Sequence, residues 1–158
     1  VILIPESPYS AEKVAEKVKA LRAAGRNFAL IIVAEAVRTG AGTAVMQTHG
    51  GGQSRYGGVG HYIGETVERL TGAEVRVTVL GHVQRGAEAV PQDRLLASVF
   101  GTHAVDMVAA GRFDRMVAWQ NREAVEVPLA EIVDKSHCVD PEGVMVRTAR
   151  QIGISFGD

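Results

Sequence analysis

The chain has 158 residues, with 17 Lys and Arg, 18 Asp and Glu, and a formal net charge of −1. This length fits one domain of about 100 to 200 residues, and the near-neutral charge argues against a nucleic-acid surface built from bulk positive charge. The content of 46% hydrophobic and 22% charged residues is typical of globular proteins and excludes a chain that is disordered by composition.

The first predicted elements are a strand, a helix and a second strand. Residues 1–4 and 28–34 are apolar runs without alternation, which is typical of strands buried on both faces. Between them, apolar residues at helical spacing predict a helix of about 14 residues, which Ser10 caps and Gly25 ends. Strands joined in this way lie parallel in a sheet, and Glu35 follows the carboxyl end of the second strand.

The middle of the chain is rich in glycine and then becomes regular again. Nine of the 18 glycines lie between residues 40 and 64, which predicts a loop or an irregular excursion. Residues 61–70 return to helical spacing, and Gly72 ends that helix. Residues 75–80 alternate valine with polar residues, which predicts a strand whose polar face carries Arg76.

The sequence Gly-His-Val-Gln-Arg-Gly, residues 81–86, follows at the carboxyl end of that predicted strand. Residues 91–110 then predict a long helix that Gly111 ends. The apolar residues of this helix predict one buried stripe, formed by Leu95, Leu96, Val99, Ala104, Val105 and Val108.

The last part of the chain predicts a short strand at residues 116–119, a helical turn at 128–133 and a final helix that Pro141 opens. In that helix one face is expected to carry Val144, Thr148 and Ile152. Alternating strands and helices predict an α/β fold, a three-layer α/β/α sandwich with a mainly parallel, Rossmann-like sheet. No repeat or linker divides residues 1–158, so we expect a single domain.

The compartment follows from cysteine usage and from the length of the apolar runs. Cys138 is the single cysteine, which excludes an intrachain disulfide framework and favours a reducing cytoplasm. The longest apolar run, residues 28–34, is far shorter than the roughly 20 residues of a membrane helix. Because the chain opens on Val1 inside a predicted strand, we also expect it to be a piece of a longer chain.

Four polar residues are the candidates for binding. Ligands of open parallel sheets collect beyond the carboxyl ends of the strands, where Glu35, His82 and Arg85 lie, and Arg76 is in the strand that leads there. Imidazole and guanidinium groups beside a carboxylate suit a ligand with an anionic end and a hydroxylated end, such as a sugar phosphate. Simpler interpretations stay open: a hydrogen-bonding loop histidine, a strand-end charge at Glu35, or a surface arginine paired to Glu74 or Glu68.

Other chemistry finds little support in the sequence. The glycine-rich segment lacks the phosphate-loop pattern G-x-x-x-x-G-K-[ST]. Neither a nucleophile nor a metal site is predicted, because no metal-ligand spacing or nucleophile context surrounds the remaining candidates: His49, His61, His103, His137, Ser54, Ser98 and Cys138.

The run Val-Thr-Val-Leu-Gly-His-Val-Gln-Arg-Gly at residues 77–86, followed by Pro-Gln-Asp-Arg at 91–94, resembles the carboxyl-terminal signature of the 6-phosphofructokinase family. Supporting similarity lies in Ile-Pro-Glu at 4–6, in the strand that closes on Glu35, and in segments 57–60, 74–80 and 148–158. The resemblance covers residues 1–158 but only the second half of a family enzyme.

The resemblance implies transfer of a phosphoryl group from ATP or pyrophosphate to the 1-hydroxyl of fructose 6-phosphate, a glycolytic reaction, with Mg²⁺ at the donor site. Glu35 would bond the fructose hydroxyls, and His82 and Arg85 would bind the 6-phosphate. Arg76 matches an arginine that reaches the 6-phosphate of a neighbouring subunit, which implies a homodimer or homotetramer. No catalytic residue is expected here, since the donor loop and catalytic base belong to an absent amino-terminal half, so the fragment alone is expected to be inactive.

Two residues depart from the family pattern: Ala87 stands where a second glycine is common, and Ala89 where a proline is frequent. If the glycine position required a positive φ, alanine would strain the loop by roughly 1 kcal/mol or more and weaken sugar binding. The alternative function is therefore a degenerate, non-catalytic half that binds a sugar phosphate as a regulatory module. Asp93 is expected to cap the following helix rather than to act as a base.

Overall fold

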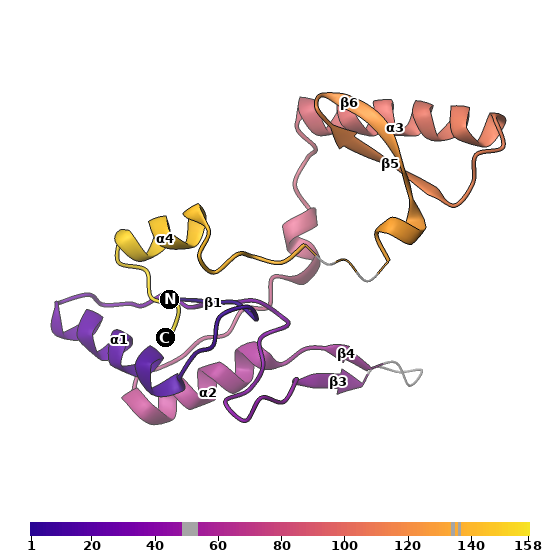
Figure 1. Ribbon diagram of the computed structural model, residues 1–158. Coiled ribbons are helices and arrows are strands. Elements are labelled where there is room, and N and C mark those ends of the chain that lie inside the picture. Colours follow the sequence, from indigo (N-terminus) through magenta and orange to yellow (C-terminus); the bar gives the residue numbers. More distant parts are fainter. Residues whose placement is uncertain (49–53, 134, 136) are drawn as a thin grey trace. The chain divides into compact units, whose positions relative to one another are not determined.

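The computed structural model describes residues 1–48, 54–133, 135 and 137–158, which divide into two compact units. Unit 1 comprises Val1–Val79 and Cys138–Asp158, and unit 2 comprises Leu80–His137 (Figure 1). A single sugar-phosphate-binding domain over residues 1–158 stays a prediction. Within the described ranges, no helix is both long and apolar enough to cross a membrane.

Unit 1 begins with the predicted strand, helix and strand. Strands β1 (Ile2–Leu3) and β2 (Ile32–Val33) pair in parallel, with Ile2 opposite Ile32. Helix α1 (Ala11–Ala23) starts at Ser10, whose hydroxyl accepts a hydrogen bond from the backbone N–H of Lys13 at 3.4 Å. The mixed α/β character and the Ser10 cap are therefore confirmed.

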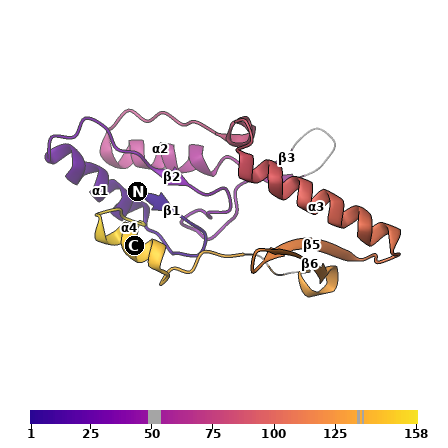
Figure 2. The same cartoon turned by 90° about the horizontal axis from the view of Figure 1, so that it is seen from above.

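Helix α2 (Val59–Thr71) packs against α1 and ends at Gly72, as predicted, although it starts two residues earlier than the pattern indicated. In Figures 1 and 2, α1 and α2 lie on one side of β1, and α4 (Val144–Gln151) lies on the other. The core cluster of unit 1 joins β1, α1, α2 and the turn after β2 through seven buried residues, Leu3, Val14, Val18, Val37, Val59, Ile63 and Val67.

The glycine-rich segment contains a short antiparallel hairpin that the sequence did not reveal. Its strands are β3 (Met46–Thr48) and β4 (Ser54–Tyr56). The triple glycine at residues 50–52 and His49 lie outside the described residues.

The strand predicted at residues 28–34 is shorter than expected and is not buried on both faces. Phe28, Leu30 and Ile32 are 80%, 67% and 54% exposed, whereas Ala29, Ile31 and Val33 pack against the core. This alternation arises because only the face toward α1 and α2 has apolar neighbours. Because this face is exposed and the parallel sheet of the described residues has only two strands, the three-layer sandwich is not confirmed.

The strand predicted at residues 75–80 is wrong, since these residues belong to no strand of the structure. The physical reason is that no strand in the described part of the chain forms a ladder with it. The expected alternation is nevertheless present at its start, where Val75 and Val77 are partly buried and Arg76 is exposed. The described strands form three two-stranded sheets, and only β1 with β2 is parallel.

Unit 2 is a helix on a hairpin. Helix α3 (Pro91–Ala109) packs against β5 (Arg115–Gln120) and β6 (Glu123–Pro128), which are antiparallel. The prediction included β5 and the helical turn, which is η2 (Leu129–Glu131), but missed β6.

The predicted buried stripe of α3 is partly wrong. Leu95, Val105 and Val108 are 66%, 67% and 61% exposed, and Ala104 is exposed as well. The helix instead turns another stripe toward the hairpin, formed by Leu96, Val99, Phe100, His103 and Met107. Because α3 is apolar on more than one side, its sequence alone could not indicate which side contacts the hairpin.

The face of α4 that carries Val144, Thr148 and Ile152 is exposed, and a different face is buried. Val144 and Ile152 are 65% and 73% exposed and Thr148 is exposed, whereas Val146 is 4% exposed. The chain after the helix brings Phe156 into the interior, where the Arg150 guanidinium carbon lies 4.9 Å from the centre of its ring. The buried face of α4 is set by this return of the chain rather than by the apolar spacing within the helix.

Candidate functional site

Glu35 lies at the tip of a tight turn directly after β2, as predicted. The Ala34 N–H donates to the Leu3 carbonyl at 3.0 Å, and the Val37 N–H donates to the Ala34 carbonyl at 3.0 Å. Val37 is only 2% exposed, so it fixes the far end of the turn in the core while the Glu35 side chain is exposed. A carboxylate presented in this way can accept hydrogen bonds from a ligand's hydroxyl groups.

Two tyrosine hydroxyl groups contact the loop that follows Glu35. The Tyr9 hydroxyl donates to the Arg38 carbonyl at 2.8 Å, and the Gly40 N–H donates to the Tyr62 hydroxyl at 3.4 Å. These contacts could not be predicted from local sequence patterns, because the partners are 29 and 22 residues apart. Burial raises the pKa of the Tyr9 phenol, and the neighbouring Tyr62 raises it further.

Arg76 lies on the exposed side of the extended segment after α2. Its Nε and Nη2 donate to Glu74 Oε1 at 3.0 and 2.9 Å, and the two side chains are 87% and 76% exposed. Arg76 therefore forms the surface ion pair with Glu74 that the simpler interpretation predicted. A solvent-exposed ion pair of this kind contributes about 0 to 1 kcal/mol to the free energy of unfolding. The guanidinium can therefore leave Glu74 for another anion.

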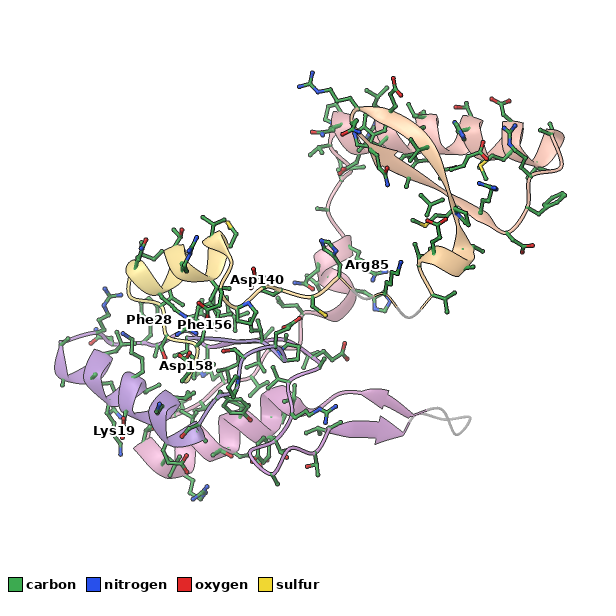
Figure 3. All side chains as sticks on the ribbon, in the orientation of Figure 1. Lys19, Phe28, Arg85, Asp140, Phe156 and Asp158 are labelled. Atoms are coloured by element: carbon green, nitrogen blue, oxygen red, sulfur yellow. The ribbon has the colours of Figure 1, made fainter. Side chains whose placement is uncertain are left out.

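His82 and Arg85 lie in a single 3₁₀ helix, η1 (Gly81–Arg85), where a loop was predicted. The turn is closed by the Val83 N–H on the Leu80 carbonyl at 3.0 Å and by the Gly86 N–H on the Val83 carbonyl at 3.1 Å. Side chains three residues apart eclipse each other in a 3₁₀ helix. Both side chains are exposed, so this turn presents an imidazole and a guanidinium on one face (Figure 3 labels Arg85).

The two departures from the family pattern leave the η1 turn unstrained. Gly86 has φ −87°, and Ala87 is not among the described residues with positive φ. Alanine adopts such a backbone freely, so the strain considered for Ala87 is absent. Asp93 lies in the first turn of α3, but the residue that caps this helix is Val90 and no side chain makes the capping hydrogen bond, so the expected Asp93 cap is wrong.

The four predicted site residues belong to different units. His82 and Arg85 lie together in unit 2, whereas Glu35 and Arg76 belong to separate segments of unit 1. Among the residues that the structure describes, no three His, Cys, Asp or Glu side chains cluster so that they could hold a metal ion.

Comparison with known proteins gives a consistent family. The sequence profile described as Phosphofructokinase matches residues 1–108. Over 158 residues the chain is 51% identical to ATP-dependent 6-phosphofructokinase 1 of Synechocystis sp. The alignment covers all of this chain and 44% of that protein. It is 48% identical to ATP-dependent 6-phosphofructokinase of Chloroflexus aggregans over all of this chain and 43% of that protein.

A more distant relative is ATP-dependent 6-phosphofructokinase of Spirochaeta thermophila, at 34% identity over 161 aligned residues and 44% of its length. The chain thus spans less than half the length of the curated relatives that it matches. Because the profile covers more than half of the chain and includes β1, β2 and the η1 turn, the chain belongs to the phosphofructokinase family.

Proposed function

We propose that this chain is the fructose 6-phosphate-binding part of a 6-phosphofructokinase. The observation that carries the proposal is the His82–Arg85 pair on one 3₁₀ turn, inside the region that the family profile matches. A guanidinium grips a phosphate through two parallel hydrogen bonds, and a protonated imidazole adds a further donor. His82 and Arg85 thus bind the 6-phosphate.

Glu35 accepts hydrogen bonds from the fructose hydroxyl groups, and Arg76 reaches the 6-phosphate bound to a neighbouring subunit of a homodimer or homotetramer. The weak surface pairing of Arg76 with Glu74 supports this role, because little free energy is lost when the guanidinium moves to a phosphate. The fold proposed for the whole sugar-binding part is the three-layer α/β/α sandwich, in which further chain covers the exposed Phe28, Leu30 and Ile32.

The reaction proposed for the full-length protein is phosphoryl transfer to the 1-hydroxyl of fructose 6-phosphate in glycolysis, in the cytoplasm. Such transfer requires a cradle for the donor phosphates, a metal ion that neutralises them and a base for the acceptor proton. We assign these parts, including Mg²⁺, to the half of the protein that lies outside this chain. ATP is the proposed donor, since the relatives carry ATP-dependent in their names.

The test is a steady-state assay of the full-length protein with ATP and with pyrophosphate as competing donors, for the wild type and Glu35→Gln. We expect activity with ATP, and a KM for fructose 6-phosphate that Glu35→Gln raises by about tenfold, with the KM for ATP unchanged. Saturable binding of fructose 6-phosphate without turnover of either donor would instead support the regulatory module. Identical KM values in both variants would remove Glu35 from the site.

A further inference from the structure

The loop that follows Glu35 is closed by bonds within itself. The Thr39 N–H donates to the Thr43 carbonyl at 2.8 Å, and the two threonine hydroxyl oxygens lie 2.6 Å apart. Arg38 and Ala44 form an antiparallel bridge at the base of the loop. These bonds define the shape of the loop but do not attach it to the helices of unit 1.

The attachment comes from two tyrosines on different parts of unit 1. Tyr9 precedes α1 and donates to the Arg38 carbonyl at 2.8 Å, whereas Tyr62 lies in α2 and accepts from the Gly40 N–H at 3.4 Å. Both rings are partly buried against the core. Since α1 and α2 supply much of that core, the base of the loop is tied to the buried core of unit 1.

We propose that Tyr9, assisted by Tyr62, is a positioning residue that orients Glu35 toward the sugar hydroxyl groups. The inference rests on the proposed function, because it assigns a role through Glu35. Arg38 is three positions after Glu35 in the chain, and the buried Val37 lies between them. The Tyr9 bond to the Arg38 carbonyl therefore holds the far end of the turn that presents the carboxylate, while the hydrogen bond from the Ala34 N–H to the Leu3 carbonyl holds its start.

The chemistry of the contact makes the role testable. The Arg38 carbonyl can only accept, so the bond requires the Tyr9 proton. The raised pKa of the Tyr9 phenol keeps that proton in place throughout the neutral range. Phenylalanine retains the packed ring and removes only the donor, so Tyr9→Phe loosens the loop without opening a cavity.

The experiment compares Tyr9→Phe and Tyr62→Phe in the full-length protein with the control Thr71→Val. The control also removes one hydroxyl, at the end of α2, where the Thr71 hydroxyl donates to the Val67 carbonyl at 2.7 Å and accepts from the Ala73 N–H at 3.1 Å. We expect Tyr9→Phe to raise the KM for fructose 6-phosphate about fivefold, the size of one lost net hydrogen bond. Tyr62→Phe should have a smaller effect because its bond is longer, and Thr71→Val should leave both KM values unchanged.

A double-mutant cycle with Glu35→Gln separates positioning from general weakening of the fold. If Tyr9 acts through Glu35, Tyr9→Phe has no further effect on this KM in the Glu35→Gln background. A full fivefold effect in that background, or equal effects on the KM for ATP, overturns the inference while the proposed function stands. An unchanged KM in Glu35→Gln alone removes Glu35 from the proposed sugar site and overturns the inference as well.

Discussion

A Cβ atom on Gly64 would lie 2.9 Å from Cγ2 of Val77 and 3.2 Å from Cγ1 of Val75. The absence of a side chain on this face of α2 therefore lets residues 75–77 lie directly on the helix. Since alternate residues of an extended segment point to opposite sides, this contact turns Arg76 away from the core. A helix glycine thus determines where a proposed phosphate-binding arginine emerges.

Gly64→Ala is expected to lower the free energy of unfolding of the full-length protein. Overpacking costs about 1 to 3 kcal/mol, which outweighs the gain of up to about 1 kcal/mol in helix propensity. Chemical denaturation measures the loss. The double variant with Val77→Ala should show a favourable coupling, because it removes the opposing methyl groups, and strictly additive effects would show that the two residues do not meet.

The pair formed by Arg76 and Glu74 is expected to matter little for stability. Glu74→Gln should change the free energy of unfolding by less than about 0.5 kcal/mol, because both side chains are exposed. It should not raise the KM for fructose 6-phosphate, whereas Arg76→Gln should raise it several-fold. Equal increases in both variants would mean that the pair itself, rather than the free guanidinium, supports the site.

Ala87→Gly is expected to leave sugar affinity unchanged. Ala87 has no positive φ, so restoring the glycine common in the family relieves no strain. Glycine widens the unfolded ensemble and should lower stability by about 0.4 to 1 kcal/mol. A marked fall in the KM for fructose 6-phosphate in this variant would show that the loop needs a backbone conformation closed to alanine.

The carboxyl-terminal segment should show an acid-dependent stability. A hydrogen bond from Arg150 lowers the pKa of the Asp158 carboxyl below its usual value. A group with a depressed pKa in the folded state stabilises above its unfolded pKa, and this contribution is lost as pH falls through the folded pKa. In Asp158→Asn this part of the pH dependence should be missing when unfolding is followed from neutral pH into the acid range, and parallel curves for both proteins would contradict the assignment.

Local signals made the helices predictable. Ser10 is the N-cap of α1, and Gly72 ends α2 with φ 65°, as their residue types indicated. Strand β6 was not predicted because the turn that precedes it lacks the residue types typical of a β-hairpin. Asn121 and Arg122 both have positive φ, as a two-residue turn requires. Arginine stands where glycine is usual, so the pattern did not indicate a hairpin.

For the site, sequence reasoning located the turn residues but not their supports. Glu35 follows a strand and His82 and Arg85 flank one turn, which are relationships between neighbours along the chain. The Tyr9 and Tyr62 contacts depend on how α1 and α2 pack, and periodicity within either helix carries no information about it. The buried faces of α3 and α4 escaped prediction for the same reason.

Binding of the sugar substrate's phosphate by the η1 turn is the role on which the proposed function depends most. Its most direct test is the double variant His82→Ala with Arg85→Ala in the full-length protein, assayed for both substrates. We expect the KM for fructose 6-phosphate to rise by about 100-fold or more, because charge-assisted bonds are lost, while the KM for ATP stays within about twofold. An unchanged KM for the sugar, or equal losses for both substrates, would contradict it.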